Sequence, residues 1–258
     1  MRAKNMFLKK FGVAALAAGV MIASLAISAK PASAAAKLKV SEKKYEKSYK
    51  LDDGTVYYEI AFAYPVVSGT KAADKINQEI TKQRKAWLKD AKSKETEYED
   101  SYKEYLDYQK TSGDDARTWT NSDQVNYEVM TNDGKYFSVL MSGYEYTGGA
   151  HGMPYRIAMT FDAKTGEKLT AAKILGTTEK KLNAKVRNLY LKKYDTQGAD
   201  AGFYGEGTEG RNTLKEALKP MKFNQAFYVK NGKLVFYVYP YELGPYAAGF
   251  IETSASIK

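Results

Sequence analysis

The chain has no cysteine and only one histidine among its 258 residues. The absence of cysteine excludes disulfide bonds, thiol nucleophiles and thiolate metal sites. A single histidine excludes every motif that needs two, including the HExxH zinc motif and the histidine pairs of carbohydrate deacetylases. We therefore expect neither a bound metal nor a cofactor.

Acidic residues are missing from the first 34 positions. Residues 1–10 carry four basic side chains, residues 11–29 are apolar and uncharged, and Ala32 and Ala34 form the small-x-small pattern that signal peptidase accepts. We predict a signal peptide over residues 1–34 and a secreted or cell-wall-associated protein. The alternative is an uncleaved membrane anchor, because about 19 apolar residues are close to the length that crosses a bilayer.

The chain has only a small excess of positive charge once this segment is removed. The chain has 40 Lys and Arg against 30 Asp and Glu, and five of the basic residues lie in residues 1–34, which leaves a net charge of +5. Such a small excess on an exported chain argues against nucleic-acid binding. A Gram-positive-type cell surface, whose wall polymers are anionic, fits a cysteine-free exported protein better.

Three dipeptides that favour two-residue hairpin turns punctuate the chain: Asp53-Gly54, Asp133-Gly134 and Asn231-Gly232. Apolar and polar residues alternate beside them, which is typical of half-buried strands. We predict strands at residues 56–64, 124–130, 135–146, 155–161, 225–230 and 233–239.

Apolar residues at three-to-four spacing predict helices at residues 71–92 and 178–194. Residues 94–110 have tyrosines at helical spacing but are otherwise charged, so we predict a frayed or solvated extension there. Thr213 and Glu216 have the spacing of a capping box and predict a helix that opens at Thr213.

Helices mixed with antiparallel hairpins indicate an α+β fold in which helices pack on antiparallel sheets. We predict two small modules, residues 35–132 and 133–258, with the boundary at the turn Asp133-Gly134.

The segment 144–152 contains the only histidine, His151. Its glycine pair could place backbone donors beside a general base, as a hydrolase needs. The alternative is a tight loop that His151 closes by bonding to the backbone, and the lack of a serine elbow or cysteine partner favours it. The candidate binding residues here are Tyr144, Tyr146, Gly148, Gly149 and His151. Glu145 could form a glycosidase-like pair with Asp162 or Glu242, although spacing cannot show that two carboxylates meet.

Aromatic residues are concentrated near the C-terminus, in a segment interrupted by two prolines. Exposed rings can stack on sugars or anchor a protein partner, whereas the alternative is packing beneath a sheet edge. The glycine-rich stretch 198–210 is a second candidate, because long loops often bind something, and its spacing does not match a calcium-binding EF-hand. The candidate binding residues in these two segments are Phe203, Tyr204, Tyr239, Tyr241, Glu242 and Tyr246.

Residues 164–193 hold nine basic and two acidic side chains. A solvated helix face is the ordinary explanation. The alternative is contact with teichoic acid or anionic lipid, with an affinity that falls as salt rises.

Several motifs occur in the order known from one family. They are Tyr146-Thr-Gly-Gly-Ala-His151, Phe161-Asp162, Thr165-Gly166-Glu-Lys-Leu169, Phe227-Tyr228 and the run from Tyr239 to Gly249. The C-terminal half of the chain, which contains these motifs, resembles the extracellular domain of RsiV-type anti-sigma factors. This resemblance implies lysozyme binding. The strand at Tyr57-Tyr58 and the following helix are similar to the companion domain of PdaC-type wall deacetylases.

We expect neither the sigma-binding segment nor the deacetylase domain of those families here. Only about ten residues precede the apolar stretch, and the sequence ends at Lys258. The expected function is a non-catalytic binding module for a lysozyme-like protein or a wall polymer such as peptidoglycan. The alternative is an envelope hydrolase that uses His151 with a carboxylate.

Overall fold

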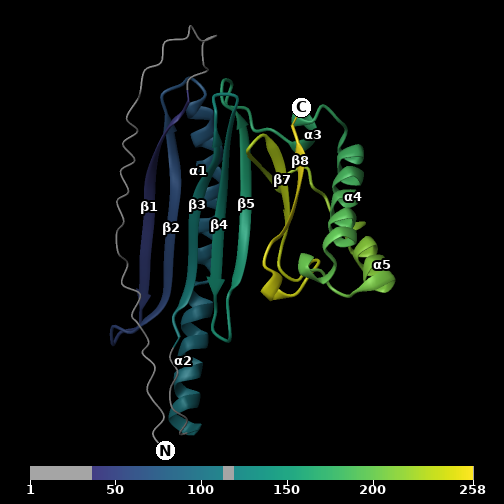
Figure 1. Ribbon diagram of the computed structural model, residues 1–258. Coiled ribbons are helices and arrows are strands. Elements are labelled where there is room, and N and C mark those ends of the chain that lie inside the picture. The colour runs from purple at the N-terminus through teal and green to yellow at the C-terminus, as the bar shows by residue number, and fades with distance from the viewer. Residues whose placement is uncertain (1–36, 113–118, 258) are drawn as a thin grey trace, which may run out of the picture. The chain divides into compact units, whose positions relative to one another are not determined.

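The structure is a computed structural model that describes residues 37–112 and 119–257 (Figure 1). The predicted signal peptide, residues 1–34, lies outside these residues. The elements along the chain are β1 (Lys39–Lys50), β2 (Val56–Ser68), α1 (Ala73–Ser93), α2 (Glu95–Ser112), β3 (Asn121–Asn132), β4 (Tyr136–Tyr146), β5 (Met153–Asp162), α3 (Ala171–Ile174), α4 (Glu179–Gln197), η1 (Gly198–Ala201), α5 (Gly207–Leu218), β6 (Phe227–Lys230), β7 (Lys233–Val238), η2 (Tyr246–Ala248) and β8 (Ile251–Ser256). This mixture confirms the predicted α+β class.

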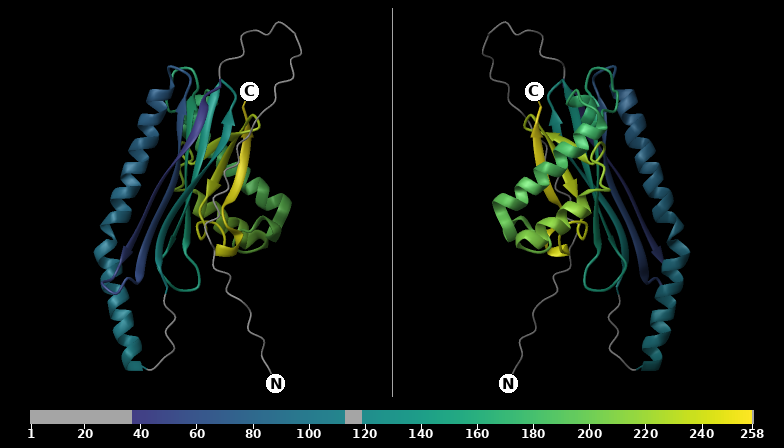
Figure 2. Two further views of the ribbon diagram at one scale, coloured as in Figure 1. Left: turned by 90° about the vertical axis from the view of Figure 1, so that its left-hand side faces the viewer. Right: turned by 90° about the vertical axis from the view of Figure 1, so that its right-hand side faces the viewer.

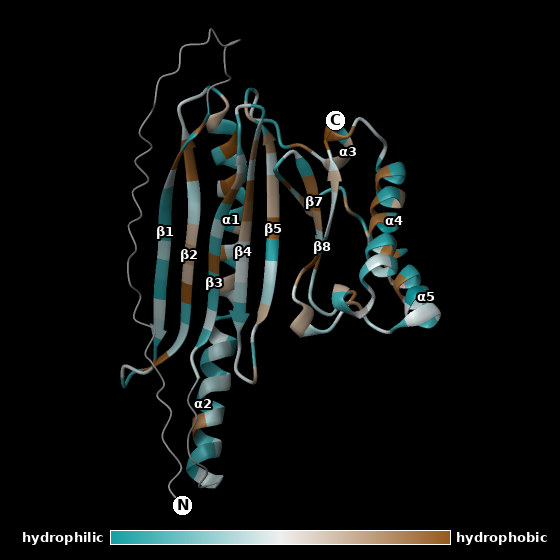
Figure 3. Cartoon of the chain, in the orientation of Figure 1, coloured by the Kyte–Doolittle hydropathy of each residue, from teal (hydrophilic) through white to brown (hydrophobic). Residues whose placement is uncertain are grey.

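The first sheet has five strands in the order β1-β2-β3-β4-β5. All neighbours are antiparallel except β2 and β3, which run parallel because α1 and α2 form the crossover between them. Both helices run along the same face of this sheet (Figures 1 and 2). The edge strand β1 is mostly hydrophilic, whereas β2 is largely hydrophobic (Figure 3). The predicted core face of β2 is confirmed, since Tyr58, Ile60 and Phe62 are buried, but the alternation is incomplete because Tyr57 and Ala63 are buried as well.

The helix α2 is continuous and anchored by two tyrosines, so the prediction of fraying was wrong, whereas the prediction of a solvated helix agrees with its mostly exposed residues. Tyr98 and Tyr102 lie four residues apart and are both buried. The ring of Tyr98 meets that of Tyr58 edge-on, with centroids 4.9 Å apart. Two large rings on one face anchor this helix despite its charged composition.

The second sheet has three antiparallel strands in the order β6-β7-β8. The helices α4 and α5 pack against it around a core that includes Leu182, Tyr190, Leu214 and Phe236. Among the described residues, no helix has the length and apolar character needed to cross a membrane.

The helix α5 begins at Gly207, so the prediction that it opens at Thr213 was wrong. Thr213 lies inside the helix and is exposed. The hydroxyl of Tyr194 donates to the carbonyls of Gly205 and Gly207 and holds the first turn in place. A Cβ on Gly210 would lie 2.3 Å from that hydroxyl oxygen, so glycine permits the close approach.

Tyrosine hydroxyls cover the free edge of β5. The hydroxyls of Tyr237 and Tyr239 donate to the carbonyl of Arg156, and the amide of Ala158 donates to the Tyr237 hydroxyl. These bonds occupy backbone groups that a sixth strand would use. They also join the second sheet to the first.

The five-stranded sheet continues past the predicted module boundary. The turn Asp133-Gly134 connects β3 and β4, which are neighbours in one sheet, and the sheet ends only at Asp162. The turn was predicted as a hairpin and is one. Its strands stay together because β4 is buried on both faces: Val139 faces α1, and Leu140 packs against Tyr228 and Tyr237.

Candidate functional site

An aromatic cluster forms where the β4–β5 turn meets the loop after β7. We call Tyr144, His151, Tyr241 and Tyr246 the His151 surface. The rings of His151 and Tyr246 stack with centroids 3.7 Å apart and an angle of 15° between their planes. The Tyr246 hydroxyl donates to the carbonyl of Gly152 at 2.9 Å. The fold thus brings together two segments about ninety residues apart that the sequence had marked separately.

The hydrogen bonds of His151 define its tautomer. Its Nδ1 lies 3.1 Å from the carbonyl oxygen of Gly152, which can only accept, so we assign the ring proton to Nδ1. Nε2 lies 3.4 Å from the Tyr241 hydroxyl and accepts from it. No carboxylate contacts His151 within the described residues. With this tautomer Nε2 is the acceptor nitrogen of His151, and the group that it contacts is the exposed Tyr241 hydroxyl.

Glycines shape the turn that carries His151. Gly148 and Gly149 have φ angles of 93° and 84°, which favour glycine. A Cβ on Gly148 would lie 2.9 Å from the Trp119 indole. The Tyr146 hydroxyl donates to the carbonyl of Gly149 and closes the turn. The geometry of the turn is therefore sufficient to explain why two glycines occur here.

Tyr241 holds an unusual backbone conformation at the rim of the cluster. Its φ angle is +70°, in the left-handed region that tyrosine rarely adopts, and its side chain is 49% exposed. The Tyr241 amide donates to the carbonyl of Gly244 at 2.9 Å. The Glu242 carboxylate accepts from the amide of Tyr239 at 2.6 Å. These two bonds hold the strained turn that presents the Tyr241 ring.

The other predicted residues divide between surface and core. Tyr204 is 42% exposed, and its amide donates to the carbonyl of Leu243, which places it beside the same loop. Phe203 was predicted to bind a ligand but is buried in the second core, where its ring meets that of Tyr194. Tyr239 is half-buried, and its hydroxyl bonds to the β5 backbone. Phe203 and Tyr239 therefore support the fold.

Of the carboxylate pairs considered from the sequence, Glu145 with Asp162 is not formed, and the Glu145 and Glu242 carboxylates each accept hydrogen bonds from other groups. Asp162 pairs in register with Tyr136, at the opposite end of β4 from Glu145, and its carboxylate accepts from the amides of Lys164 and Thr165. Within residues 37–112 and 119–257, no group of three His, Asp or Glu side chains could hold a metal ion.

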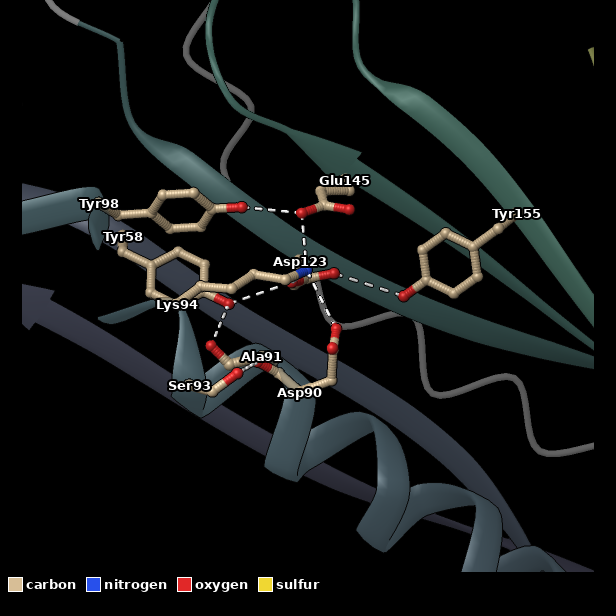
Figure 4. Close-up of polar contacts among 9 residues, drawn as sticks. All are labelled: Tyr58, Asp90, Ala91, Ser93, Lys94, Tyr98, Asp123, Glu145 and Tyr155. Atoms are coloured by element: carbon tan, nitrogen blue, oxygen red, sulfur yellow. Dashed lines mark hydrogen bonds and ion pairs between the residues drawn. The ribbon is translucent and has the colours of Figure 1, made fainter. Parts of the chain in front are cut away.

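A second polar cluster was not predicted from the sequence (Figure 4). We call Tyr58, Lys94, Tyr98, Asp123, Glu145 and Tyr155 the polar network. The Lys94 Nζ lies 2.6 Å from Glu145 and 3.2 Å from Asp123. The hydroxyls of Tyr58 and Tyr155 reach Asp123, and that of Tyr98 donates to Glu145 at 2.7 Å. Six side chains from β2, the helices and β3 to β5 converge there.

The network places two carboxylates directly opposite each other, because Asp123 pairs with Glu145 across β3 and β4. Like charges in this position repel, and Lys94 between them removes the repulsion. Burial raises the pKa of Asp123 above its ordinary value, and Lys94 opposes this shift. Burial alone would lower the pKa of Lys94, but its bonds to Glu145 and Asp123 raise it overall.

The polar network also supports the His151 surface. Glu145 is the last residue but one of β4 and pairs with Met153 at the start of β5. The ion pair with Lys94 therefore fixes the base of the turn that carries His151. Asp123 directly precedes the strand predicted at residues 124–130, whereas β3 begins at Asn121. An acid two residues before the buried Val125, and so on the same face of the strand, is the signal that could have revealed this cluster.

Two family models match separate parts of the chain. Residues 51–154 match a family described as deacetylase PdaC, and residues 172–254 match a protein family of unknown function, DUF3298. These matches confirm the resemblance of the two halves to different families. The families indicate a protein related to the cell envelope.

Solved structures from two organisms share the fold. A DUF3298 family member from Bacteroides fragilis is 19% identical, with a TM-score of 0.56 over 85% of this chain and 90% of that one. A DUF3298 family protein from Pseudomonas aeruginosa is 14% identical, with a TM-score of 0.56 over 86% and 91%. No curated protein gives a significant match.

Proposed function

We propose that this chain is a secreted or wall-associated, non-catalytic module that binds a glycan of the cell envelope through the His151 surface. The observation that carries the proposal is the strained, exposed Tyr241 beside the stacked pair of His151 and Tyr246. Backbone strain persists where the surrounding structure enforces it, and it is concentrated at ligand sites. An exposed ring at such a position is suited to stacking on a sugar.

Two further observations support binding rather than bond cleavage. Both ring nitrogens of His151 contact groups of the protein itself, and no carboxylate lies against them among the described residues. Tyr241 within the His151 surface, and Tyr204 and Met153 outside it, are large side chains left exposed. Tyrosine provides contact area at low entropic cost, which suits a recognition surface.

The test is co-sedimentation of the full chain with purified peptidoglycan. We expect binding, and we expect Tyr246→Ala to weaken it about tenfold, because loss of one stacked ring costs roughly 1 kcal/mol or more. Tyr108→Ala is the matched control, because Tyr108 is 61% exposed on α2, apart from this cluster.

A parallel measurement with lysozyme separates the two ligand classes. Binding to lysozyme that depends on Tyr246, without binding to peptidoglycan, would replace the glycan by a protein partner. Equal losses for Tyr246→Ala and Tyr108→Ala would show that the His151 surface is not the site.

A further inference from the structure

A small cavity lies between α1 and the β1–β2 hairpin. Its lining residues are distant in the sequence from those of the His151 surface. Its volume is about 220 Å³, and its lining includes Lys43, Tyr64, Asn77, Thr81 and Arg84. Such a volume is sufficient for a small oxyanion. Neither family resemblance nor the sequence patterns drew attention to these residues.

Two elements supply cationic residues to the lining of this cavity, β1 with Lys43 and α1 with Arg84. Lys43 on β1 and Tyr64 on β2 are direct cross-strand partners, so their side chains lie on the same face of the sheet. Arg84 on α1 lies over the Tyr64 ring, with its Cζ 4.9 Å from the ring centroid. The ring supports the guanidinium from one side and leaves its edge available for hydrogen bonds.

These two cations have no acidic partner. Within residues 37–112 and 119–257, neither Lys43 nor Arg84 forms a salt bridge, and no carboxylate is among the lining residues. Among the described residues, the Nε of Arg84 is buried and has no hydrogen-bond partner, as is also true of Arg156 and Arg187. Buried donors are normally satisfied, so the Arg84 guanidinium retains unused hydrogen-bonding capacity.

The neighbouring polar groups do not supply an acceptor to this guanidinium. The side-chain oxygen of Asn77 accepts from the amide of Val67 at 2.9 Å, and its nitrogen donates to the carbonyl of Val67 at 2.8 Å. Asn77 is thus engaged with the β2 backbone. Thr81 adds a hydroxyl to the lining. The cavity therefore offers two positive charges and a hydroxyl to a ligand rich in acceptors.

We propose that this cavity binds a phosphoryl group, with the Arg84 guanidinium and the Lys43 ammonium as its donors. Guanidinium edges match phosphate oxygens in bidentate geometry, and a second cation nearby suits a phosphoryl group, whose oxygens can accept from both donors. The group could belong to free phosphate or to a phosphodiester polymer, and the chemistry of recognition is the same. The proposal is independent of glycan binding at the His151 surface.

The test is an NMR titration of the full chain with sodium phosphate at constant ionic strength, followed at the Nε–H resonance of Arg84. We expect a saturable shift of that resonance. Lys43→Gln should weaken binding about tenfold, because a charge-assisted hydrogen bond to phosphate contributes on the order of a tenfold change in affinity. Lys85→Gln, an exposed neighbour on α1, is the matched control and should titrate like the unmodified chain.

Further titrations identify the source of the phosphoryl group and the results that would contradict the proposal. Poly(glycerol phosphate) that binds at least as tightly as phosphate identifies a polymer, and binding of phosphate alone identifies the free ion. The proposal is overturned if sodium chloride shifts the resonance equally, if acetate binds as tightly as phosphate, or if Lys43→Gln and Lys85→Gln titrate alike. Lys43 is exposed on an edge strand, so its replacement leaves the fold intact even if an Arg84 variant does not fold.

Discussion

Tyr241 carries a left-handed backbone conformation, which costs an L-residue about 1 kcal/mol or more. Replacing it by glycine removes this strain together with the ring. We predict that Tyr241→Gly reduces peptidoglycan binding about tenfold. Its free energy of unfolding should stay within about 1 kcal/mol of the original, because the greater freedom of glycine in the unfolded chain offsets the relief of strain. Denaturant unfolding and co-sedimentation measure the two effects.

The chain contains its own control for this prediction. Asn231, in the β6–β7 turn, also has a positive φ, of 50°. Asn231→Gly should change stability to a similar small extent and leave binding intact. If Tyr241→Gly binds peptidoglycan as well as Asn231→Gly does, the strained tyrosine has no part in recognition.

At single positions, the sequence identified the aromatic residues but not their exposure. Phe203 and Tyr204 are adjacent, yet the first is buried and the second is 42% exposed. Which of them faces the core depends on the close approach of Gly202 to Gly244, where a Cβ on Gly244 would lie 1.9 Å from the Gly202 carbonyl. Such a contact between distant loops leaves no local pattern.

The polar network joins the junction of α1 and α2 to four strands, and the Lys94 ammonium group contacts both of its carboxylates. We predict that Lys94→Met lowers the free energy of unfolding by about 3 kcal/mol, because it leaves Asp123, whose side chain is 5% exposed, as an uncompensated buried charge. Lys110→Met on α2 is the matched control, since Lys110 forms an exposed pair with Asp107 and its loss should change stability by less than about 1 kcal/mol. Urea unfolding of both variants checks this.

A small and equal effect of these two substitutions would show that Lys94 does not offset the facing carboxylates. The same variants also test the link to the His151 surface. Lys94→Met should weaken peptidoglycan binding under conditions where it remains folded, because Glu145 at the base of the turn loses its partner.

Helices and strands were predictable from the sequence where residues close along the chain determine them. The core face of β2 and the spacing in α4 were sufficient, and Thr178 accepts from the amide of Lys181 as an N-cap should. The packing of α2 and the start of α5 were not predictable. Tyr102 is buried under distant elements, and the Tyr194 hydroxyl fixes the first turn of α5 from another helix.

The molecule as a whole contains 22 tyrosines, and many are buried with raised pKa values. Burial raises the pKa of Tyr57 to about 12 and raises those of Tyr58, Tyr98, Tyr155 and Tyr190. The folded state therefore keeps protons that the unfolded state loses above its ordinary tyrosine pKa of 10.0. This stability is present in full below the unfolded-state pKa and is lost as the pH rises from that value through the raised folded-state pKa values.

We predict steep alkaline unfolding, in which each such tyrosine lowers the free energy of unfolding by about 1.4 kcal/mol per pH unit. Denaturant unfolding between about pH 9 and pH 11 measures the slope. Tyr98→Phe should make it shallower by the contribution of one proton, and Tyr108→Phe, an exposed control, should not. A stability independent of pH across this range would contradict the prediction.

The hydroxyls of Tyr237 and Tyr239 bond to the β5 backbone, so the edge of the first sheet depends on residues that follow it in the chain. A fragment ending at residue 162 would expose an uncapped strand and the apolar side chains of Leu140 and Ala158. Edges of this kind recruit further strands, so such a fragment would self-associate into aggregates. The two regions match different families, yet we expect the first sheet to need the tyrosines of the second to cover its edge.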